Sequence, residues 1–247
     1  MTRLDQVLVE RGLCESREKA KRAIMAGQVR VNGQPARKPS DVIKPGDELS
    51  LATGEKYVSR GGLKLEHALA EFQLDVRGVV ALDLGASTGG FTDCLLQAGA
   101  GIVFAVDVGH GQLAWKLRRD RRVVVMEKTN ARYLTAAQFP QPFVSAAVVV
   151  VDCSFISLRK ILPPAVALLQ PAGKLVALIK PQFEAGRAEV DRGAGVIRDP
   201  AIHERVIAEL QAFVAVQPGL NWKQVTESPL LGPAGNKEFL VLIEKSG

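Results

Sequence analysis

Runs of Val, Ile and Leu alternate with helical segments through most of this chain, beginning after Gly62. The apolar runs include "VVALDLG", "GIVFAVDVG", "VVVME", "SAAVVVVD" and "GKLVALIKP". Strands buried on both faces have such continuous apolar sequences, and parallel neighbours need a long crossover connection, usually a helix. The pattern predicts an α/β fold with a doubly wound parallel sheet, closed by two strands in "NWKQVTES" and "KEFLVLIEK". One helix, in "SLRKILPPAVALLQ", is expected to break at Pro163 and Pro164.

The start of the chain has a different pattern, which predicts a small α+β domain. Apolar residues at helical spacing predict one helix that ends before Gly12 and a second one between Ser16 and Gly27. The Asn32-Gly33 pair between two short strands is a strong hairpin signal. The expected organisation is a domain at 1–53, a linker at 54–62 and a second domain at 63–247.

Composition excludes several classes of protein. The 247 residues are 47% hydrophobic, enough for a real core, yet no apolar run approaches the roughly 18 residues of a membrane helix. No secretory leader opens the sequence. Cys14, Cys94 and Cys153 form neither a disulfide framework nor metal-ligand spacing, so a cytoplasmic location without a bound metal is expected.

The net charge of +6 lies mostly in the first quarter of the chain. Residues 1–64 carry 13 Lys and Arg against 8 Asp and Glu, whereas the other residues carry 19 against 18. Such asymmetry indicates a polyanionic partner, most often nucleic acid, or else a basic surface that serves solubility.

A glycine-rich turn follows the first apolar run of the second domain, in "LDLGASTGGFTD". Glycines let backbone N–H groups and a helix N-terminus approach a ligand closely. Asp107 ends the next strand, 22 residues after Gly85, where a carboxylate accepts the ribose hydroxyls of an adenosine. Because the spacing matches neither a dinucleotide fingerprint nor a P-loop, the loop suits S-adenosylmethionine. A tight strand–helix turn without a ligand stays as the alternative, weakened by Asp83 and Asp107 at successive strand ends.

Further chemically active side chains follow strands at the same expected sheet edge. Asp152 and Lys180 end neighbouring strands, so an ion pair between them is expected. Burial and a nearby cation favour the neutral form of a lysine amine, which can then act as a base. Lys64 and Glu238 are expected to face the same region. Taken singly, each of these charges is better explained as a surface group than as a catalyst, but as a set at strand ends they favour a functional site.

The chain resembles the TlyA family of ribosomal RNA 2′-O-methyltransferases, often called haemolysins. The motifs that carry the resemblance are "SRGGLKLEHAL", "LDLGASTGGFTD", "VDVGHGQLAWKLR", "DCSFISL", "LIKPQFEAG" and "GNKEFLVLI". The first 53 residues are similar to the S4-like RNA-binding domain. The resemblance implies a Rossmann-like class I methyltransferase sheet of the FtsJ type, S-adenosylmethionine as methyl donor and a cytidine ribose in ribosomal RNA as acceptor. The family's shorter form is associated with large-subunit RNA, which is therefore the expected substrate of a chain that ends nine residues after Glu238.

The resemblance also implies roles for single residues. The family's Lys-Asp-Lys-Glu set falls on Lys64, Asp152, Lys180 and Glu238. It implies Lys180 as base for the 2′-hydroxyl, tuned and oriented by Lys64 and Asp152, with Glu238 supporting the amine or the ribose. The implied methyl-donor site comprises Asp83, Gly85, Ala86, Ser87, Thr88, Gly89, Gly90, Phe91, Asp107, Val108, Asn130, Ala131 and Asp152.

Two groups of cations are candidates for contacts with RNA phosphates. Such contacts supply affinity but little sequence specificity. The first comprises Arg3, Arg17, Lys19, Lys21, Arg22, Arg30 and Arg60. The second either guides RNA or is a solvated helix end, and comprises Lys116, Arg118, Arg119, Arg121 and Arg122. Since aromatic residues are only 5% of the chain, we expect recognition of folded RNA shape rather than base stacking.

Three other classes of protein compete with an RNA methyltransferase. A non-catalytic ribosome assembly factor would bind RNA without methyl transfer, and the Lys-Asp-Lys-Glu set argues against it. A nicotinamide oxidoreductase would explain the sheet and Asp107, but the glycine spacing disagrees. A membrane-lysing protein should have a spanning or strongly amphipathic segment, and none stands out. Ribosomal RNA or a ribosomal subunit is thus the expected partner, with neither a membrane nor an obligate protein partner.

Overall fold

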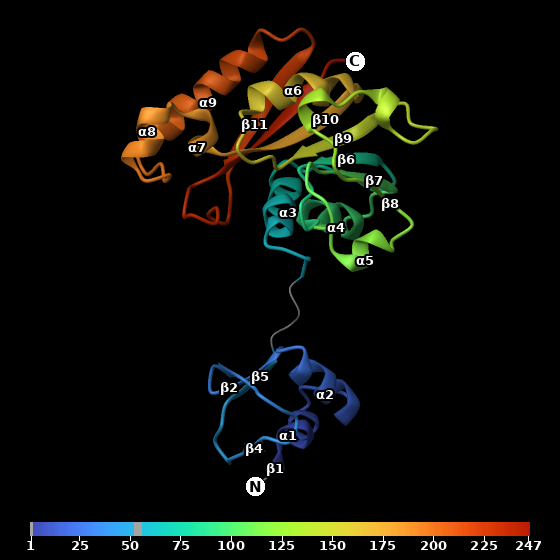
Figure 1. Cartoon of the computed structure of the whole chain (residues 1–247), viewed down its shortest axis with the longest axis vertical. Helices are drawn as coiled ribbons and strands as arrows, with labels where there is room; N and C mark the ends of the chain where they lie inside the picture. The colour runs from blue at the N-terminus through green and yellow to red at the C-terminus, as the bar shows by residue number, and fades with distance from the viewer. Residues whose placement is uncertain (1, 52–55) are drawn as a thin grey trace. The chain divides into compact units, whose positions relative to one another are not determined.

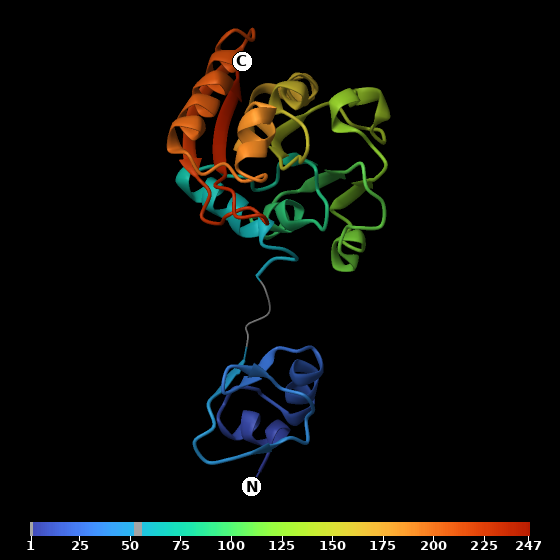
Figure 2. The same ribbon diagram turned by 60° about the vertical axis from the view of Figure 1, so that its left-hand side comes forward.

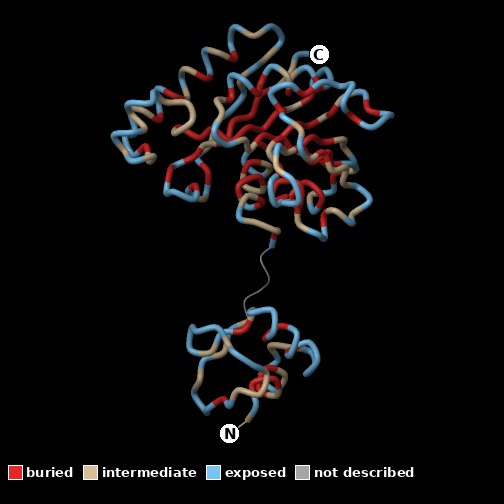
Figure 3. The backbone as a smooth tube through the Cα atoms, viewed as in Figure 1, coloured by how far each residue is buried: buried red, intermediate tan, exposed pale blue. Residues whose placement is uncertain are grey.

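The computed structural model describes residues 2–51 and 56–247 and contains two compact units, Met1–Lys56 and Tyr57–Gly247. Each unit has its own helices and strands (Figure 1) and its own buried interior (Figure 3). The predicted linker at 54–62 lies partly outside the described residues. Its remainder belongs to the second unit from Tyr57 onward, because the Tyr57 ring is buried in that unit's core and a helix begins at Gly61.

The first unit packs two helices against short strands. Ser16 caps the second helix by accepting a hydrogen bond from the Lys19 backbone N–H at 3.3 Å. Asn32 and Gly33 both have positive φ, as the predicted hairpin turn requires. The buried core is built from both helices and from strands β2 and β4. The elements are β1 Thr2–Arg3, α1 Leu4–Glu10, α2 Arg17–Met25, β2 Val29–Val31, β3 Gln34–Pro35, β4 Val42–Ile43 and β5 Leu49–Leu51.

The second unit is built on a seven-stranded sheet in the order β11-β12-β10-β9-β6-β7-β8. Neighbouring strands are parallel from β10 through β8, whereas β12 runs antiparallel to both β10 and β11. This confirms the predicted α/β fold and the closing pair of strands. The strands are β6 Val80–Leu84, β7 Ile102–Val106, β8 Val123–Met126, β9 Ala146–Val151, β10 Leu169–Ile179, β11 Leu220–Glu227 and β12 Phe239–Lys245.

Helices cover both faces of this sheet (Figure 2). Side chains alternate between the faces along each strand, so Leu82 and Leu84 pack with α6 and α9, whereas Ala81 packs with α3 and α4. The α-helices of the unit are α3 Gly61–Glu71, α4 Gly90–Gln97, α5 Trp115–Arg118, α6 Leu158–Ala167, α7 Pro181–Glu184, α8 Arg187–Arg192 and α9 Pro200–Ala215. Among the described residues, none of the helices combines the length and apolarity needed to cross a membrane.

Helix α6 corrects one expectation, because it continues through Pro163 and Pro164 instead of breaking there. Each proline removes a backbone donor, which weakens the ladder. The buried face of α6, which includes Ile161 and Leu162, packs in the core. Tertiary packing therefore holds a helix that its local sequence disfavours.

The parallel strands bring their carboxyl ends to one edge of the sheet, where doubly wound folds bind ligands. The loops that follow β6, β7, β9 and β10 begin at this edge. They carry Gly85, Asp107, Asp152 and Lys180 immediately after the strands. Residues far apart in the sequence thus meet in one region.

Removal of a central strand side chain should destabilise the second unit. Leu82 is fully buried, so Leu82→Ala is expected to lower the free energy of unfolding by about 2–5 kcal/mol, through lost burial and a new cavity. Leu231, which is 52% exposed, is the matched control, and Leu231→Ala should change it by less than about 0.5 kcal/mol. Urea unfolding measures the free energy of unfolding of both variants. Equal losses for Leu82→Ala and Leu231→Ala would contradict the assignment of Leu82 to the core.

Candidate functional site

Two adjoining hollows lie at the carboxyl edge of the sheet, with volumes of about 300 and 470 Å³. Gly85, Ser87, Asp152 and Ser154 line both, so the hollows share a wall. Such volumes are typical of small-molecule sites. The first is further lined by Ser59, Arg60, Gly61, Lys64, Ala86, Thr88, Gly90, Phe91, Lys180, Pro233 and Glu238. The second is further lined by Val106, Asp107, Val108, Gln112, Thr129, Asn130, Ala131, Cys153, Phe155, Ile156 and Ile161.

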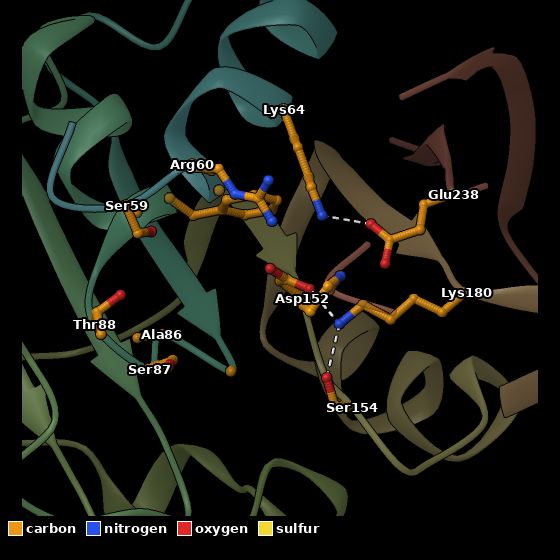
Figure 4. A pocket seen from close by; sticks show the side chains of 15 residues that line it. Ser59, Arg60, Lys64, Ala86, Ser87, Thr88, Asp152, Ser154, Lys180 and Glu238 are labelled. Atoms are coloured by element: carbon orange, nitrogen blue, oxygen red, sulfur yellow. Dashed lines mark hydrogen bonds and ion pairs between the residues drawn. The ribbon is translucent and has the colours of Figure 1, made fainter. Parts of the chain in front are cut away.

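Lys180 lines the first hollow, and its two partners line both hollows. Its Nζ is 2.6 Å from Asp152 Oδ1 and donates a hydrogen bond to Ser154 Oγ at 2.8 Å (Figure 4). Strands β9 and β10 are parallel neighbours with Val151 opposite Ala177, which brings the residues after their ends together. Only 9% of Lys180 is exposed, so its amine is held by these partners rather than by bulk water.

Lys64 and Glu238 form a second ion pair across the first hollow (Figure 4). Lys64 projects from α3, and Glu238 comes immediately before β12, whose Phe239 pairs with Ile179 of β10. Both residues are buried, with Glu238 only 1% exposed. Glu238 therefore neutralises Lys64, so the four charges of the expected set form two pairs within one cavity.

The glycine-rich loop after β6 fits closely against its surroundings. Gly85 has φ +89, and a Cβ there would lie 2.7 Å from the Asp152 carbonyl oxygen. A Cβ at Gly90 would lie 2.3 Å from Ser59 Oγ. Both positions thus require glycine for close approach. The result is an open backbone turn at the wall shared by the hollows.

Asp107 organises the second hollow. Its Oδ2 accepts a hydrogen bond from the Ser87 N–H at 2.8 Å, and its Oδ1 accepts one from the Gly109 N–H at 2.6 Å. Val108, Asn130 and Ala131 line the same hollow. The Asp107 carboxylate therefore lines a space with both apolar and polar walls, which is suited to an adenosine.

Asp83 and Gly89 line neither hollow, although the resemblance implied both for the donor site. Asp83 is fully buried beneath the loop and accepts a hydrogen bond from Thr92 Oγ1 at 2.6 Å. Burial raises the pKa of the Asp83 carboxyl to about 7. A Cβ at Gly89 would clash with Leu117, so this glycine faces the packed helix α5.

The candidate RNA contacts lie in different surroundings. Arg3 and Arg17 both bond the buried carboxylate of Asp5, and the Arg3 hydrogen bond contributes most to lowering the Asp5 pKa to about 2. Lys19 pairs with Glu15, and Arg30 donates to the Gly33 carbonyl at 3.0 Å. Lys21 and Arg22 are exposed on α2, whereas Arg60 lines the first hollow.

The second cation cluster is largely paired within the protein. Lys116 pairs with Asp93, Arg118 with Glu127 and Arg122 with Asp120. Within the described ranges, Arg119 and Arg121 of this cluster take part in none of the ion pairs found.

The lining residues that the sequence did not predict include Ser59, Ser154, Phe155 and Pro233. Phe155 is 90% exposed and has φ +61, an uncommon conformation for a bulky residue. The position of "SF" just after the strand end at Asp152 was a usable signal for Ser154 and Phe155. Pro233 had no comparable signal, because it comes from a loop between β11 and β12.

Comparison with known proteins agrees with this architecture. Residues 57–245 match the FtsJ-like methyltransferase family, and residues 2–49 match the S4 domain. YqxC of Bacillus subtilis, provisionally described as an rRNA methyltransferase, is 51% identical over 99% of this chain and 86% of its own. TlyA of Mycobacterium tuberculosis, named a 16S/23S rRNA (cytidine-2′-O)-methyltransferase, is 46% identical over 97% of this chain and 88% of its own. A Streptococcus thermophilus structure, provisionally described as a hemolysin, is 48% identical with a TM-score of 0.75, covering 99% of this chain and 88% of that one.

The buried carboxyl of Asp83 should make stability depend on pH. Between its ordinary value near 3.8 and about 7, the folded state holds a proton that the unfolded state has released, so the free energy of unfolding falls as pH rises. Asp83→Asn, which keeps an acceptor for Thr92, should remove this fall. The free energy of unfolding of Asp83→Asn, relative to that of the parent protein, should be higher at pH 8 than at pH 5 by more than about 1 kcal/mol.

Asp75→Asn provides the control for this pH effect. Asp75 is exposed, and its hydrogen bond from Arg77 lowers its pKa to about 2, below the tested range. Its effect should be equal at pH 5 and pH 8. Urea unfolding at both pH values measures these free energies. If Asp83→Asn changed the free energy of unfolding equally at pH 5 and pH 8, the buried carboxyl would not be neutral.

Proposed function

The chain belongs to the TlyA family, which joins an S4 domain to an FtsJ-like methyltransferase domain, and we propose that it methylates the 2′-hydroxyl of a cytidine in ribosomal RNA. The methyl donor is S-adenosylmethionine, which supplies an electrophilic methyl carbon on a sulfonium. The new bond joins the 2′ oxygen to this carbon, while the carbon–sulfur bond breaks and leaves its electron pair on sulfur. A cytoplasmic location follows from a ribosomal substrate.

One observation carries the proposal: the buried Lys180 amine lines the first hollow and contacts Asp152 and Ser154, which belong to the wall that the two hollows share. A ribose in the first hollow and a methyl donor reaching across the shared wall would meet beside Lys180 Nζ. An alcohol is a poor nucleophile, so a positioned base assists by accepting its proton. In this proposal Lys180 takes that proton, and Asp152, 2.6 Å away, stabilises the ammonium that forms.

Donor binding is assigned mainly to the second hollow. Asp107 would accept the ribose hydroxyls of the donor's adenosine, with Asn130 and Ala131 near its adenine. The open turn at Gly85–Phe91, which carries most of the remaining donor residues, would hold the methionine part. These residues fit the donor because the Asp107 carboxylate, apolar lining residues and the backbone of the glycine-rich turn lie in one region of the protein.

The Lys64–Glu238 pair is assigned to the acceptor side. Both residues line the first hollow opposite the glycine-rich turn (Figure 4). Because each neutralises the other, the pair adds two fixed polar groups without adding net charge. We assign it to orienting the target ribose beside Lys180, with Arg60 contacting a nearby phosphate.

Large-subunit RNA is the proposed substrate, following the family resemblance. The Mycobacterium tuberculosis relative is named for both 16S and 23S RNA, so the two subunits must be tested side by side. The S4 domain would contribute phosphate contacts through Arg3, Arg17 and the exposed cations of α2. Methylated small-subunit RNA would contradict the proposed subunit without affecting the proposed chemistry.

Replacing the proposed base should stop transfer but not donor binding. Lys180→Ala is expected to lower the rate of methyl transfer by a factor of about 100 or more, because general base assistance is lost. The assay measures tritiated methyl transfer to ribosomal subunits that lack the modification, followed by mapping of the product. Lys160→Ala, at an exposed lysine of α6, should keep full activity. Full activity of Lys180→Ala would contradict its assignment as base.

Asp107 should govern affinity for the donor. Asp107→Asn is expected to raise the dissociation constant for S-adenosylmethionine about tenfold, since a charge-assisted hydrogen bond to the ribose is weakened. Titration calorimetry with the full chain measures this constant. Asp191→Asn, at a surface carboxylate of α8, is the matched control and should bind normally. An unchanged constant for Asp107→Asn would exclude a ribose contact.

A further inference from the structure

Ser154 is a polar residue at the candidate site to which the Lys-Asp-Lys-Glu set gives no role. Its Oγ accepts a hydrogen bond from Lys180 Nζ at 2.8 Å, and the residue lines both hollows. Lys180 therefore has two fixed partners, Asp152 and Ser154, on the same loop (Figure 4).

The geometry of an amine explains what a second partner achieves. A lysine nitrogen has three positions besides its carbon, occupied by three protons in the ammonium or by two protons and a lone pair in the neutral amine. Ser154 engages one of these positions through its hydrogen bond, and the Asp152 carboxylate, an ion pair at 2.6 Å, attracts a second. Only one position is left for the first hollow, which Lys180 lines. If Asp152 were the only partner, rotation about the Cε–Nζ bond could place either a proton or the lone pair at the position that faces the first hollow.

The local backbone also supports a specific role for this hydroxyl. Phe155, the next residue, has φ +61, and its side chain is 90% exposed, so its own burial does not explain the conformation. Such backbone strain persists where surrounding contacts over-determine it, and it clusters at functional sites. Here the left-handed turn comes directly after the hydroxyl that bonds Lys180.

We propose that Ser154 is a positioning residue that directs the lone pair of Lys180 toward the target 2′-hydroxyl. The inference rests on the proposed function, because it assigns a partner to the proposed base. In the transfer step, the 2′ oxygen bonds the methyl carbon, the carbon–sulfur pair goes to sulfur, and the hydroxyl proton fills the position that Ser154 and Asp152 leave open. Ser154 itself gains and loses no proton.

The test compares Ser154→Ala with Ser154→Thr in the full chain, using ribosomal subunits that lack the modification. Ser154→Ala should lower kcat on the order of tenfold, because the hydrogen bond that orients the Lys180 amine is lost. KM for the subunit and the dissociation constant for S-adenosylmethionine should stay within about twofold of the parent. Ser154→Thr, which keeps the hydroxyl, should restore kcat to within about threefold of the parent.

Ser157→Ala separates positioning from simple support of the fold. Ser157 Oγ bonds Glu184 at 2.6 Å and caps α6 on the same loop. Loss of the Ser157 hydroxyl should lower the melting temperature, while kcat stays near that of the parent. Ser154→Ala should show the opposite pattern, with kcat reduced and the melting temperature nearly unchanged.

Each outcome decides. Full kcat in Ser154→Ala, a higher KM at unchanged kcat, or failure of Thr to restore kcat would overturn the positioning role while the proposed function stands. Absence of methyl transfer by the parent chain to either subunit would instead overturn the proposed function, and the role of Ser154 with it.

Discussion

The contact between Lys180 and Asp152 is the interaction on which the account of this protein depends. It exists because β9 and β10 are parallel neighbours whose carboxyl ends reach the same edge of the sheet. The last four residues of each strand are apolar and buried, so the fold places two opposite charges at the boundary between core and cavity. Without the crossover through α6 that makes these strands parallel, the pair would lie at opposite edges.

Burial makes the site's charges interdependent. Lys64 and Glu238 are both nearly excluded from water, so removing either one leaves the other unpaired, at a cost on the order of 3–5 kcal/mol. If one partner alone were replaced, a loss of activity could therefore come either from a lost role in the reaction or from a destabilised fold. Lys180 differs because it has two partners, Asp152 and Ser154, and lines the open cavity. Its hydrogen-bond geometry can be changed through Ser154 without stranding a buried charge.

Much of the architecture could be predicted from the sequence, because apolar periodicity and turn residues act locally. The Asn32-Gly33 hairpin, the cap at Ser16 and the parallel strands are examples. The expected break of α6 at Pro163 was wrong, since burial of the helix face outweighs local propensity. At the site, strand ends predicted that Asp152 meets Lys180. The partner of Glu238 and the bond from Lys180 to Ser154 depend on side-chain directions across distant elements, which periodicity does not encode.

The most direct test is a structure of the chain bound to S-adenosylhomocysteine and its ribosomal RNA target. In that structure Lys180 Nζ should lie within about 3.2 Å of the target 2′ oxygen. The donor sulfur should lie on the side of that oxygen away from the amine, with the adenosine against Asp107. A 2′ oxygen held far from Lys180, with another side chain or only water beside it, would contradict the account.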